Sequence, residues 1–201
     1  MNNVEIDFAE VSRKLELERR LHDTPASARV RGVFARLLQQ SLRSRGFGSS
    51  LDMASLLGEQ PRSYRLYPAR EMLVAYARAG ALVNPDPGEG IRTLFREIAD
   101  PFSRTWYGRT LQRLLRSDPM SALEFLERSR DHMVNFGMWR VEPRGPGHAV
   151  LHLIDEYFWI ETAHRGGCEG LLDACGVSGS VSVELDSLYC GRLEVRWQLR
   201  N

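Results

Sequence analysis

Several runs in the last third of the chain alternate between apolar and polar positions, which is the pattern of a half-buried β-strand. Residues 138–142 and 148–154 both alternate, and a segment rich in proline and glycine separates them. Two such runs around a turn of this composition predict a β-hairpin. The run 148–154 is apolar on both faces, so we expect it to be an interior strand. Two further alternating runs, 181–185 and 193–199, predict a second pair of strands.

The first two thirds of the chain have helical spacing instead. After Ser27, a suitable N-cap, apolar residues share one helical face, namely Val30, Val33, Phe34, Leu37, Leu38 and Leu42. Gly32 lies within that helix, where glycine costs about 1 kcal/mol relative to alanine. We therefore expect it to mark the close approach of another element. Further helices are predicted over residues 10–21, 51–57, 68–83, 91–99, 103–116 and 119–136, with a surface loop at 84–90.

The order of these elements defines the fold class. A predicted helix at 161–175, ended by Gly176, lies between the two pairs of strands. A helical N-terminal part packed on a C-terminal antiparallel sheet, with the order strand–strand–helix–strand–strand, is an α+β fold. The predicted organisation is an N-terminal arm and helix at 1–26 and a single α+β domain at 27–201, helical over 27–136 and with the sheet plus helix over 137–201.

The composition and net charge limit the classes of protein to which this chain can belong. Hydrophobic residues make up 43% of the 201 residues, enough for a core, and the formal net charge is +1. Nonspecific nucleic-acid binding needs a concentrated basic surface, so we expect no nucleic-acid partner. The start of the sequence lacks the regions of a secretory signal, and no run of about 18 apolar residues could span a membrane. Together with three sparse cysteines, these features predict a cytoplasmic protein without disulfides and without a membrane span.

Several short motifs resemble those of a known family. They are Ala28-Arg29-Val30-Arg31-Gly32-Val33-Phe34, Tyr67-Pro68, Gly108-Arg109-Thr110 followed by Asp118-Pro119, Phe136-Gly137, Leu171–Gly176 and Val195-Arg196-Trp197. Over about residues 14–198 the chain resembles a myxobacterial paralogous domain family of unknown function. That family is similar to the fold shared by haem-nitric-oxide-binding domains, vinyl-4-reductase-type domains and subunits of Golgi tethering complexes. The resemblance implies a bacterial regulatory or interaction module and supplies no catalytic residues.

The same resemblance raises the question of haem. In the haem-nitric-oxide-binding relatives, a helix histidine is the axial ligand and a Tyr-x-Ser-x-Arg motif binds the propionates. That motif is absent from this sequence, and His132 and His164 are the histidines on predicted helices near the relevant region. We therefore predict no cofactor.

Cysteine and histidine spacing gives weak metal candidates. His164 and Cys168 share one helix face with Cys175, and Cys190 could join them from the last hairpin. Cys168 and Cys175 lie about 10.5 Å apart along a helix axis, whereas two thiolates on one zinc ion are at most about 4.6 Å apart. Buried core thiols are the alternative that we favour. His148 shares a strand face with His152, but about 13 Å separates them, too far to bind one metal.

Aromatic residues provide the remaining candidate sites. Tyr157, Phe158, Trp159 and Ile160 lie where a connection is expected, and four bulky apolar residues in a connection indicate a lid or an exposed contact patch. A ligand pocket would instead be lined by aromatic residues on the helices and the sheet, for which we name Phe34, Tyr76, Tyr107 and Trp139.

Catalytic signatures are missing from the sequence. It contains no Gly-x-Ser-x-Gly, phosphate-binding loop or His-Glu-x-x-His motif. The carboxylates Asp155, Glu156 and Glu161 are expected to be solvated at the end of the hairpin. We therefore predict a non-enzymatic regulatory module that signals by binding a protein partner or by forming a homo-oligomer through residues 157–160. The alternative is a sensor domain that binds a small apolar ligand, such as an acyl chain or haem, between helices and sheet.

Overall fold

The structure is a computed structural model that describes residues 7–47, 61–103 and 118–198. The chain folds into two compact units, Met1–Leu94 and Phe95–Asn201. The division falls within one helix, α6 (Pro87–Ser103). The sequence predicted a different boundary, between an N-terminal arm and helix at 1–26 and a single domain at 27–201, and that boundary stays a prediction.

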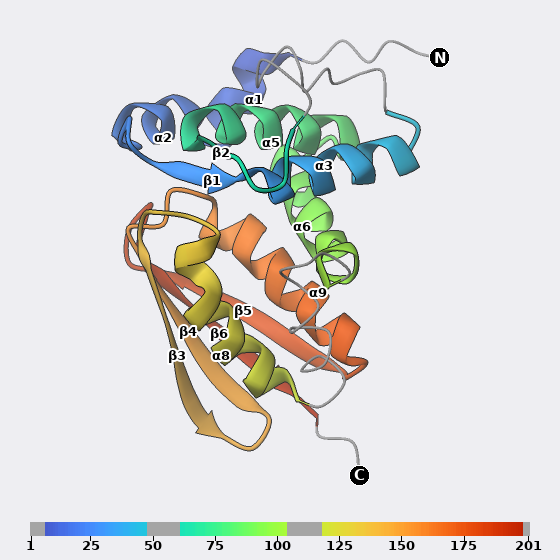
Figure 1. Cartoon of the computed structure of the whole chain (residues 1–201), viewed down its shortest axis with the longest axis vertical. Coiled ribbons are helices and arrows are strands. Elements are labelled where there is room, and N and C mark those ends of the chain that lie inside the picture. Colours follow the sequence, from blue (N-terminus) through green and yellow to red (C-terminus); the bar gives the residue numbers. More distant parts are fainter. Residues whose placement is uncertain (1–6, 48–60, 104–117, 199–201) are drawn as a thin grey trace. The chain divides into compact units, whose positions relative to one another are not determined.

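The first unit is helical. Its elements are α1 (Phe8–Lys14), α2 (Leu17–Asp23), β1 (Arg29–Arg31), α3 (Gly32–Ser44), β2 (Leu66–Pro68), α5 (Ala69–Val83) and the start of α6. Helices α1, α2 and α3 all contact α5, and β1 pairs with β2 in an antiparallel ribbon (Figure 1). Leu38, Met72 and Tyr76 are almost fully buried. The core of this unit therefore lies around α5.

The helix predicted from Ser27 begins later than expected. Residues 29–31 form β1 because their backbone pairs with β2, and α3 starts at Gly32. The backbone N–H of Gly32 donates to the carbonyl oxygen of Arg65 at 2.8 Å. A Cβ on Gly32 would clash with the Arg62 carbonyl oxygen and the Tyr67 ring. The close approach predicted at this glycine is confirmed.

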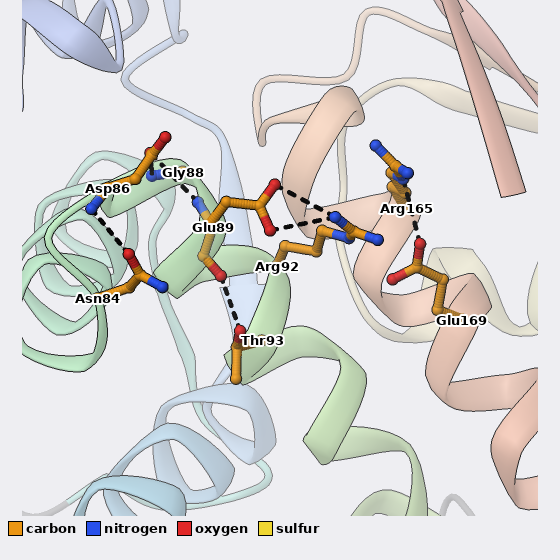
Figure 2. Close-up of polar contacts among 8 residues, drawn as sticks. All are labelled: Asn84, Asp86, Gly88, Glu89, Arg92, Thr93, Arg165 and Glu169. Atoms are coloured by element: carbon orange, nitrogen blue, oxygen red, sulfur yellow. Dashed lines mark hydrogen bonds and ion pairs between the residues drawn. The ribbon is translucent and has the colours of Figure 1, made fainter.

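Helix α6 begins inside the predicted surface loop 84–90. The Asp86 carboxylate accepts from the backbone N–H of Gly88 at 2.9 Å, and the Asn84 side chain accepts from the N–H of Asp86 at 2.8 Å (Figure 2). Asp86 thus caps the first turn, and the proline at 87 suits a first helical position. Within that turn, Glu89 pairs with Arg92 at 3.1 Å. Local side-chain capping therefore starts the helix earlier than its apolar periodicity indicated.

The second unit is a four-stranded antiparallel sheet with helices packed on it. It continues from α6 through α8 (Pro119–Ser129), the 3₁₀ turn η1 (Arg130–His132), β3 (Met138–Gly145), β4 (His148–Ile154), the π-helix η2 (Ile160–His164), α9 (Arg165–Cys175), β5 (Gly179–Leu185) and β6 (Gly191–Trp197). The strand order is β3-β4-β6-β5. Helices α8 and α9 contact this sheet and each other (Figure 1).

The alternation read from the sequence sets the two faces of this sheet. Ala149, Leu151 and Leu153 are buried on one face of β4, and the register places Leu193 and Val195 beside them. The hairpin, the interior position of β4 and the end of α9 at Gly176, whose φ is 65°, are all confirmed. The α+β fold class is therefore confirmed. The helix predicted at 51–57 lies outside the described residues, as does all of the helix predicted at 103–116 except Ser103, which ends α6.

Helix lengths can also be compared with the thickness of a bilayer. Among the residues that the structure describes, no helix combines the length and the apolar character needed to span a membrane.

Candidate functional site

A buried carboxylate joins several elements of the second unit. Glu156, which follows β4, is 1% exposed. One carboxylate oxygen accepts from the indole N–H of Trp139 at 2.8 Å, and the other accepts from the backbone N–H of Phe158 at 3.1 Å. The imidazole of His164 lies 3.4 Å from that second oxygen. The backbone N–H of Glu156 also donates to the carbonyl oxygen of Tyr189 at 2.9 Å. One residue thus links β3, η2 and the β5–β6 connection.

Local backbone geometry places this carboxylate. The chain turns sharply after β4 at Asp155, whose φ is 52°. Gly137 lies against this turn with φ 70°, and a Cβ there would clash with backbone oxygens of Ile154 and Asp155. A larger residue could not adopt this conformation so closely packed. The turn therefore brings Glu156 back toward Trp139, which pairs with Leu153 across the hairpin.

Glu156 is ionised despite its burial. Burial raises the pKa of the carboxyl group, but the electrostatic interaction with the His164 imidazole and the hydrogen bonds from Trp139 and the Phe158 N–H lower it, and the net pKa lies below the usual value. A buried charge is tolerated only when it is paired and hydrogen-bonded. The His164 side chain is itself only 12% exposed. Its ring meets the Trp139 ring edge to face, with centroids 5.2 Å apart. The three side chains form one cluster, which we call the Glu156 cluster.

The π-helix carries the imidazole of this cluster. Residues 160–164 of η2 precede α9, and the N–H of His164 donates to the Trp159 carbonyl oxygen at 3.2 Å. Single turns of π-helix are often found at functional sites. The Thr162 hydroxyl is buried here, with no hydrogen-bond partner among the described residues. The segment predicted as a single helix at 161–175 is therefore divided between the end of the π-helix η2 and the α-helix α9.

The predicted docking surface is not exposed. Phe158, Trp159 and Ile160 are 6%, 1% and 0% exposed. The Phe136 ring lies 5.3 Å from that of Tyr157 and 6.2 Å from that of Phe158, measured between centroids. The turn at Asp155 and the hydrogen bonds of Glu156 draw the segment inward. The expected exposure is therefore wrong for Phe158, Trp159 and Ile160, whereas Tyr157 is half-buried. That residues 157–160 bind a partner stays a prediction.

The candidate pocket residues fall into different parts of the chain. In the first unit, the hydroxyl of the buried Tyr76 donates to the carbonyl oxygen of Phe34 at 3.2 Å, and burial raises the pKa of Tyr76. Trp139 belongs to the second unit and to the Glu156 cluster. Tyr107 lies outside the described residues. That these four residues line one pocket stays a prediction.

The weak metal candidates are not arranged as a site. Burial raises the pKa of the Cys168 thiol to about 12, with a further increase from the charge of Glu169. A thiol protonated at neutral pH is a poor metal ligand, because the thiolate is the form that binds. His164 faces Glu156, and Cys190 is half-buried in the β5–β6 connection. Among the described residues, no three His, Cys, Asp or Glu side chains lie close enough to hold a metal ion.

Two other histidines lie on the outer face of the sheet. His148 pairs with Glu194 at 2.9 Å, and His152 pairs with Glu142 at 3.0 Å. Hydrogen bonding from His152 lowers the pKa of Glu142, although that carboxyl group is exposed. These histidines are therefore part of a network of charged pairs on the surface, in keeping with their predicted positions on one strand face.

Sequence reasoning missed Glu156 because it grouped this residue with Asp155 as a solvated acidic cluster. A weak signal was nevertheless present, since Glu156 directly precedes the apolar run 157–160. The sequence gives no hint that Trp139 and His164, which are 25 positions apart (164 minus 139), contact the same carboxylate.

The arrangement of helices and sheet can be compared with solved structures. The chain has the fold of H-NOX domains. It matches the Fe(II) unliganded H-NOX protein from K. algicida with a TM-score of 0.67 and 11% identity over 85% of this chain and 97% of that chain. It matches an H-NOX protein from S. oneidensis in the Fe(II)NO ligation state with a TM-score of 0.62 and 11% identity, over 84% of this chain and 99% of that chain. At this level of identity the likeness establishes the fold alone.

The family follows from the sequence. The chain belongs to the DUF2378 family of proteins of unknown function, whose model matches residues 24–198. No curated protein matches the chain significantly. The resemblance inferred from the short motifs is thereby confirmed, both for a family of unknown function and for the haem-nitric-oxide-binding fold.

Proposed function

We propose that this chain is a non-enzymatic sensor domain that binds a small apolar ligand other than haem. The observation that carries the proposal is the likeness to H-NOX domains, which extends over 85% of this chain and 97% of the K. algicida protein. A fold retained over nearly the whole length of a ligand-binding domain favours a related use, although fold alone does not dictate function. The alternative of the sequence analysis, a ligand sensor, is therefore preferred to an interaction module.

The hypothesis of a protein-interaction module depended on an exposed surface at residues 157–160. A docking surface must offer side chains to its partner, and Phe158, Trp159 and Ile160 are buried. Exposing them would remove apolar surface from the core at a cost of about 1.5–3 kcal/mol for each large side chain. We therefore do not assign this segment to a partner.

Haem is left out of the proposal because none of the histidines is placed to serve as its axial ligand. All five histidines lie in described parts of the chain. His22 and His132 are exposed, and His148 and His152 pair with glutamates on the outer sheet face. The remaining imidazole, His164, is held between Trp139 and the ionised Glu156. A ligand without iron suits this set of side chains better.

The Glu156 cluster offers a physical route for reporting ligand binding. The Trp139 side chain is half-buried and its indole N–H is bonded to Glu156. A ligand that contacts the indole would change the position of the N–H donor. Since the same carboxylate holds the Phe158 N–H and faces His164, any such change reaches the π-helix. Trp139 is thus the proposed receiving residue and η2 the proposed responding element.

Native mass spectrometry of the purified full chain, combined with an absorbance spectrum, tests this function. We expect an organic adduct on the 22.9 kDa polypeptide, removable by solvent extraction, and no Soret band even after growth with a haem precursor. The extracted chain should bind Nile red, and the ring resonances of His164 in NMR spectra should shift on binding. Trp139→Phe should retain the dye but lose most of that shift. Stoichiometric haem, or an extracted chain that binds neither Nile red nor decanoate, would contradict the proposal.

A further inference from the structure

A basic groove lies on the first unit, which does not contain the Glu156 cluster. It is formed by α3 and residues 61–64 and encloses about 710 Å³. Side chains from both elements line it, among them Arg36, Gln39, Gln40, Arg43, Arg62 and Tyr64. None of its described lining residues is acidic. The volume falls within the range of about 300–1,000 Å³ that is typical of sites for small molecules.

The charge of the arginines in the groove is not balanced by an ion pair within the described part of the chain. Arg36, Arg43 and Arg62 form no ion pair with a carboxylate of the described residues. Elsewhere in the chain guanidinium groups do find such partners, as Arg96 does with both oxygens of Asp173 at 2.6 and 3.1 Å. Three guanidinium groups without a carboxylate partner among the described residues, placed around one concavity, produce a local positive potential that favours an anion. The net charge of the whole chain is close to zero, so it does not reveal this local excess of positive charge.

The groove is preformed because its second wall is fixed to the first. The Ser63 carbonyl oxygen accepts from the backbone N–H of Val33 at 3.1 Å, and the Ser63 hydroxyl accepts from Arg36 at 3.0 Å. The backbone N–H of Arg62 donates to the hydroxyl of the buried Tyr67 at 2.9 Å. Gly32 allows the Arg62 carbonyl oxygen to approach α3 closely. A site held in shape before binding loses less entropy when its ligand arrives.

An exposed aromatic ring stands at the edge of the groove. Tyr64 is 66% exposed, which is more than any other large apolar or aromatic residue that the structure describes. Its hydroxyl accepts from Arg62 at 3.4 Å, which orients the ring relative to the cationic groups. An unburied aromatic ring beside guanidinium groups can stack on a planar ligand.

We propose that this groove binds a small phosphorylated aromatic ligand of the nucleotide class. The guanidinium groups of Arg36, Arg43 and Arg62 would hold the phosphate, since their fork of N–H donors matches phosphate oxygens. The Tyr64 ring would stack on the base. A single mononucleotide is favoured over a nucleic-acid strand because the groove has the volume of a small-molecule site and the chain has nearly neutral charge.

Isothermal titration of the full chain with AMP, adenosine and inorganic phosphate tests the proposal. We expect AMP to bind at least about tenfold more tightly than either part alone. Arg43→Gln should weaken AMP binding by about tenfold or more, the value of a lost charged hydrogen bond. Tyr64→Ser should weaken it by at least about fivefold through lost stacking, while Tyr64→Phe should retain most of the affinity. Arg13→Gln, which removes an exposed charge of the same unit outside the groove, is the matched control.

Three outcomes would overturn the assignment. The first is that AMP, GMP, CMP and UMP all fail to bind at about 1 mM, an affinity of roughly 4 kcal/mol. The second is that Arg36→Gln/Arg43→Gln binds AMP as well as the unsubstituted chain. The third is that a short RNA binds while mononucleotides do not, which would indicate a strand instead. This site is separate from the proposed apolar-ligand site, so either result leaves the mass-spectrometric test unaffected.

Discussion

Glu156 is the residue at which burial and charge conflict most directly. Removing a carboxylate from water costs several kcal/mol, and the cost is offset only by good partners. Here the Trp139 N–H, the Phe158 N–H and the imidazole of His164 surround the two oxygens at 2.8, 3.1 and 3.4 Å. Because the partners come from three segments of the chain, the carboxylate fixes their mutual positions. Losing it should affect the whole second unit.

The acid stability of the chain should therefore depend on Glu156. Its pKa in the folded chain lies below the reference value of 4.5, so the unfolded state takes up a proton first as pH falls. The stabilisation is complete above about pH 4.5 and is lost as pH drops through the folded pKa. Glu156→Gln should lower the free energy of unfolding at pH 7 by about 3–5 kcal/mol, the cost of breaking a buried pair. The free energy of unfolding of the Glu156→Gln chain should also fall less steeply as the pH is lowered.

Urea unfolding monitored between pH 7 and pH 3 measures both effects. Glu18→Gln, an exposed change on α2, is the control and should alter stability by less than about 0.5 kcal/mol. A Glu156→Gln chain with the stability of the unsubstituted one at pH 7, and with the same acid dependence, would mean that the cluster contributes nothing to folding.

At the scale of the elements, the position at which helix α3 begins depends on its first residue, Gly32. The helix starts where β1 ends, and residues 62–65 lie over that junction through the bonds to Gly32 and Val33. Helix propensity by itself opposes glycine at this position, and the packing of the neighbouring segment outweighs it. The same contact supports one wall of the proposed nucleotide groove. A local preference is thus overruled by a tertiary contact, which also shapes the proposed groove.

Two glycine-to-alanine substitutions separate propensity from packing. At Gly32 a methyl group would meet the Arg62 carbonyl oxygen and the Tyr67 ring, so Gly32→Ala should destabilise the chain by about 1–3 kcal/mol through overpacking. At Gly167 in α9 a methyl group would meet nothing within 4 Å, so Gly167→Ala should stabilise the chain by up to about 1 kcal/mol. Thermal unfolding of the two variants would show opposite shifts in Tm. Equal shifts in the same direction would contradict the role given to the contact at Gly32.

At the scale of the whole molecule, the chain consists of two compact units with separate cores. Residues 1–94 contain no tryptophan, and all four tryptophans belong to residues 95–201. Helices dominate the first unit and the sheet lies in the second. Tryptophan fluorescence therefore reports on the second unit, whereas far-ultraviolet circular dichroism weights the first more strongly.

Unfolding by denaturant should consequently differ between the two probes. Since each unit has its own core, we expect the fluorescence and circular-dichroism midpoints to diverge, and Glu156→Gln to shift the fluorescence midpoint more. Gly32→Ala should shift the circular-dichroism midpoint more, which provides the reciprocal control. Coincident curves for all three chains would mean that the two units unfold as one cooperative whole.

Several features of this protein followed from the sequence because they depend on local spacing. Alternation in 138–142 and 148–154 predicted the hairpin, and its register is now seen in the pairing of Trp139 with Leu153. The helix predicted from residue 119 does begin there as α8, where the Asp118 carboxylate accepts from the N–H of Ser121 at 2.9 Å. These signals involve residues within a few positions of each other, so a one-dimensional pattern contains them.

Other features required the folded chain. Nothing in the spacing of Trp139, Glu156 and His164 indicates that one carboxylate joins them, because the turn at Asp155 and the sheet register bring them together. The burial of Phe158 and Trp159 likewise results from that turn and reverses the expectation of an exposed patch. Periodicity determined the elements and the α+β class, since it records which face of each element avoids water. Contacts between distant residues decided the buried ionic cluster and the basic groove, because charge pairing and concavity arise only once separate segments meet.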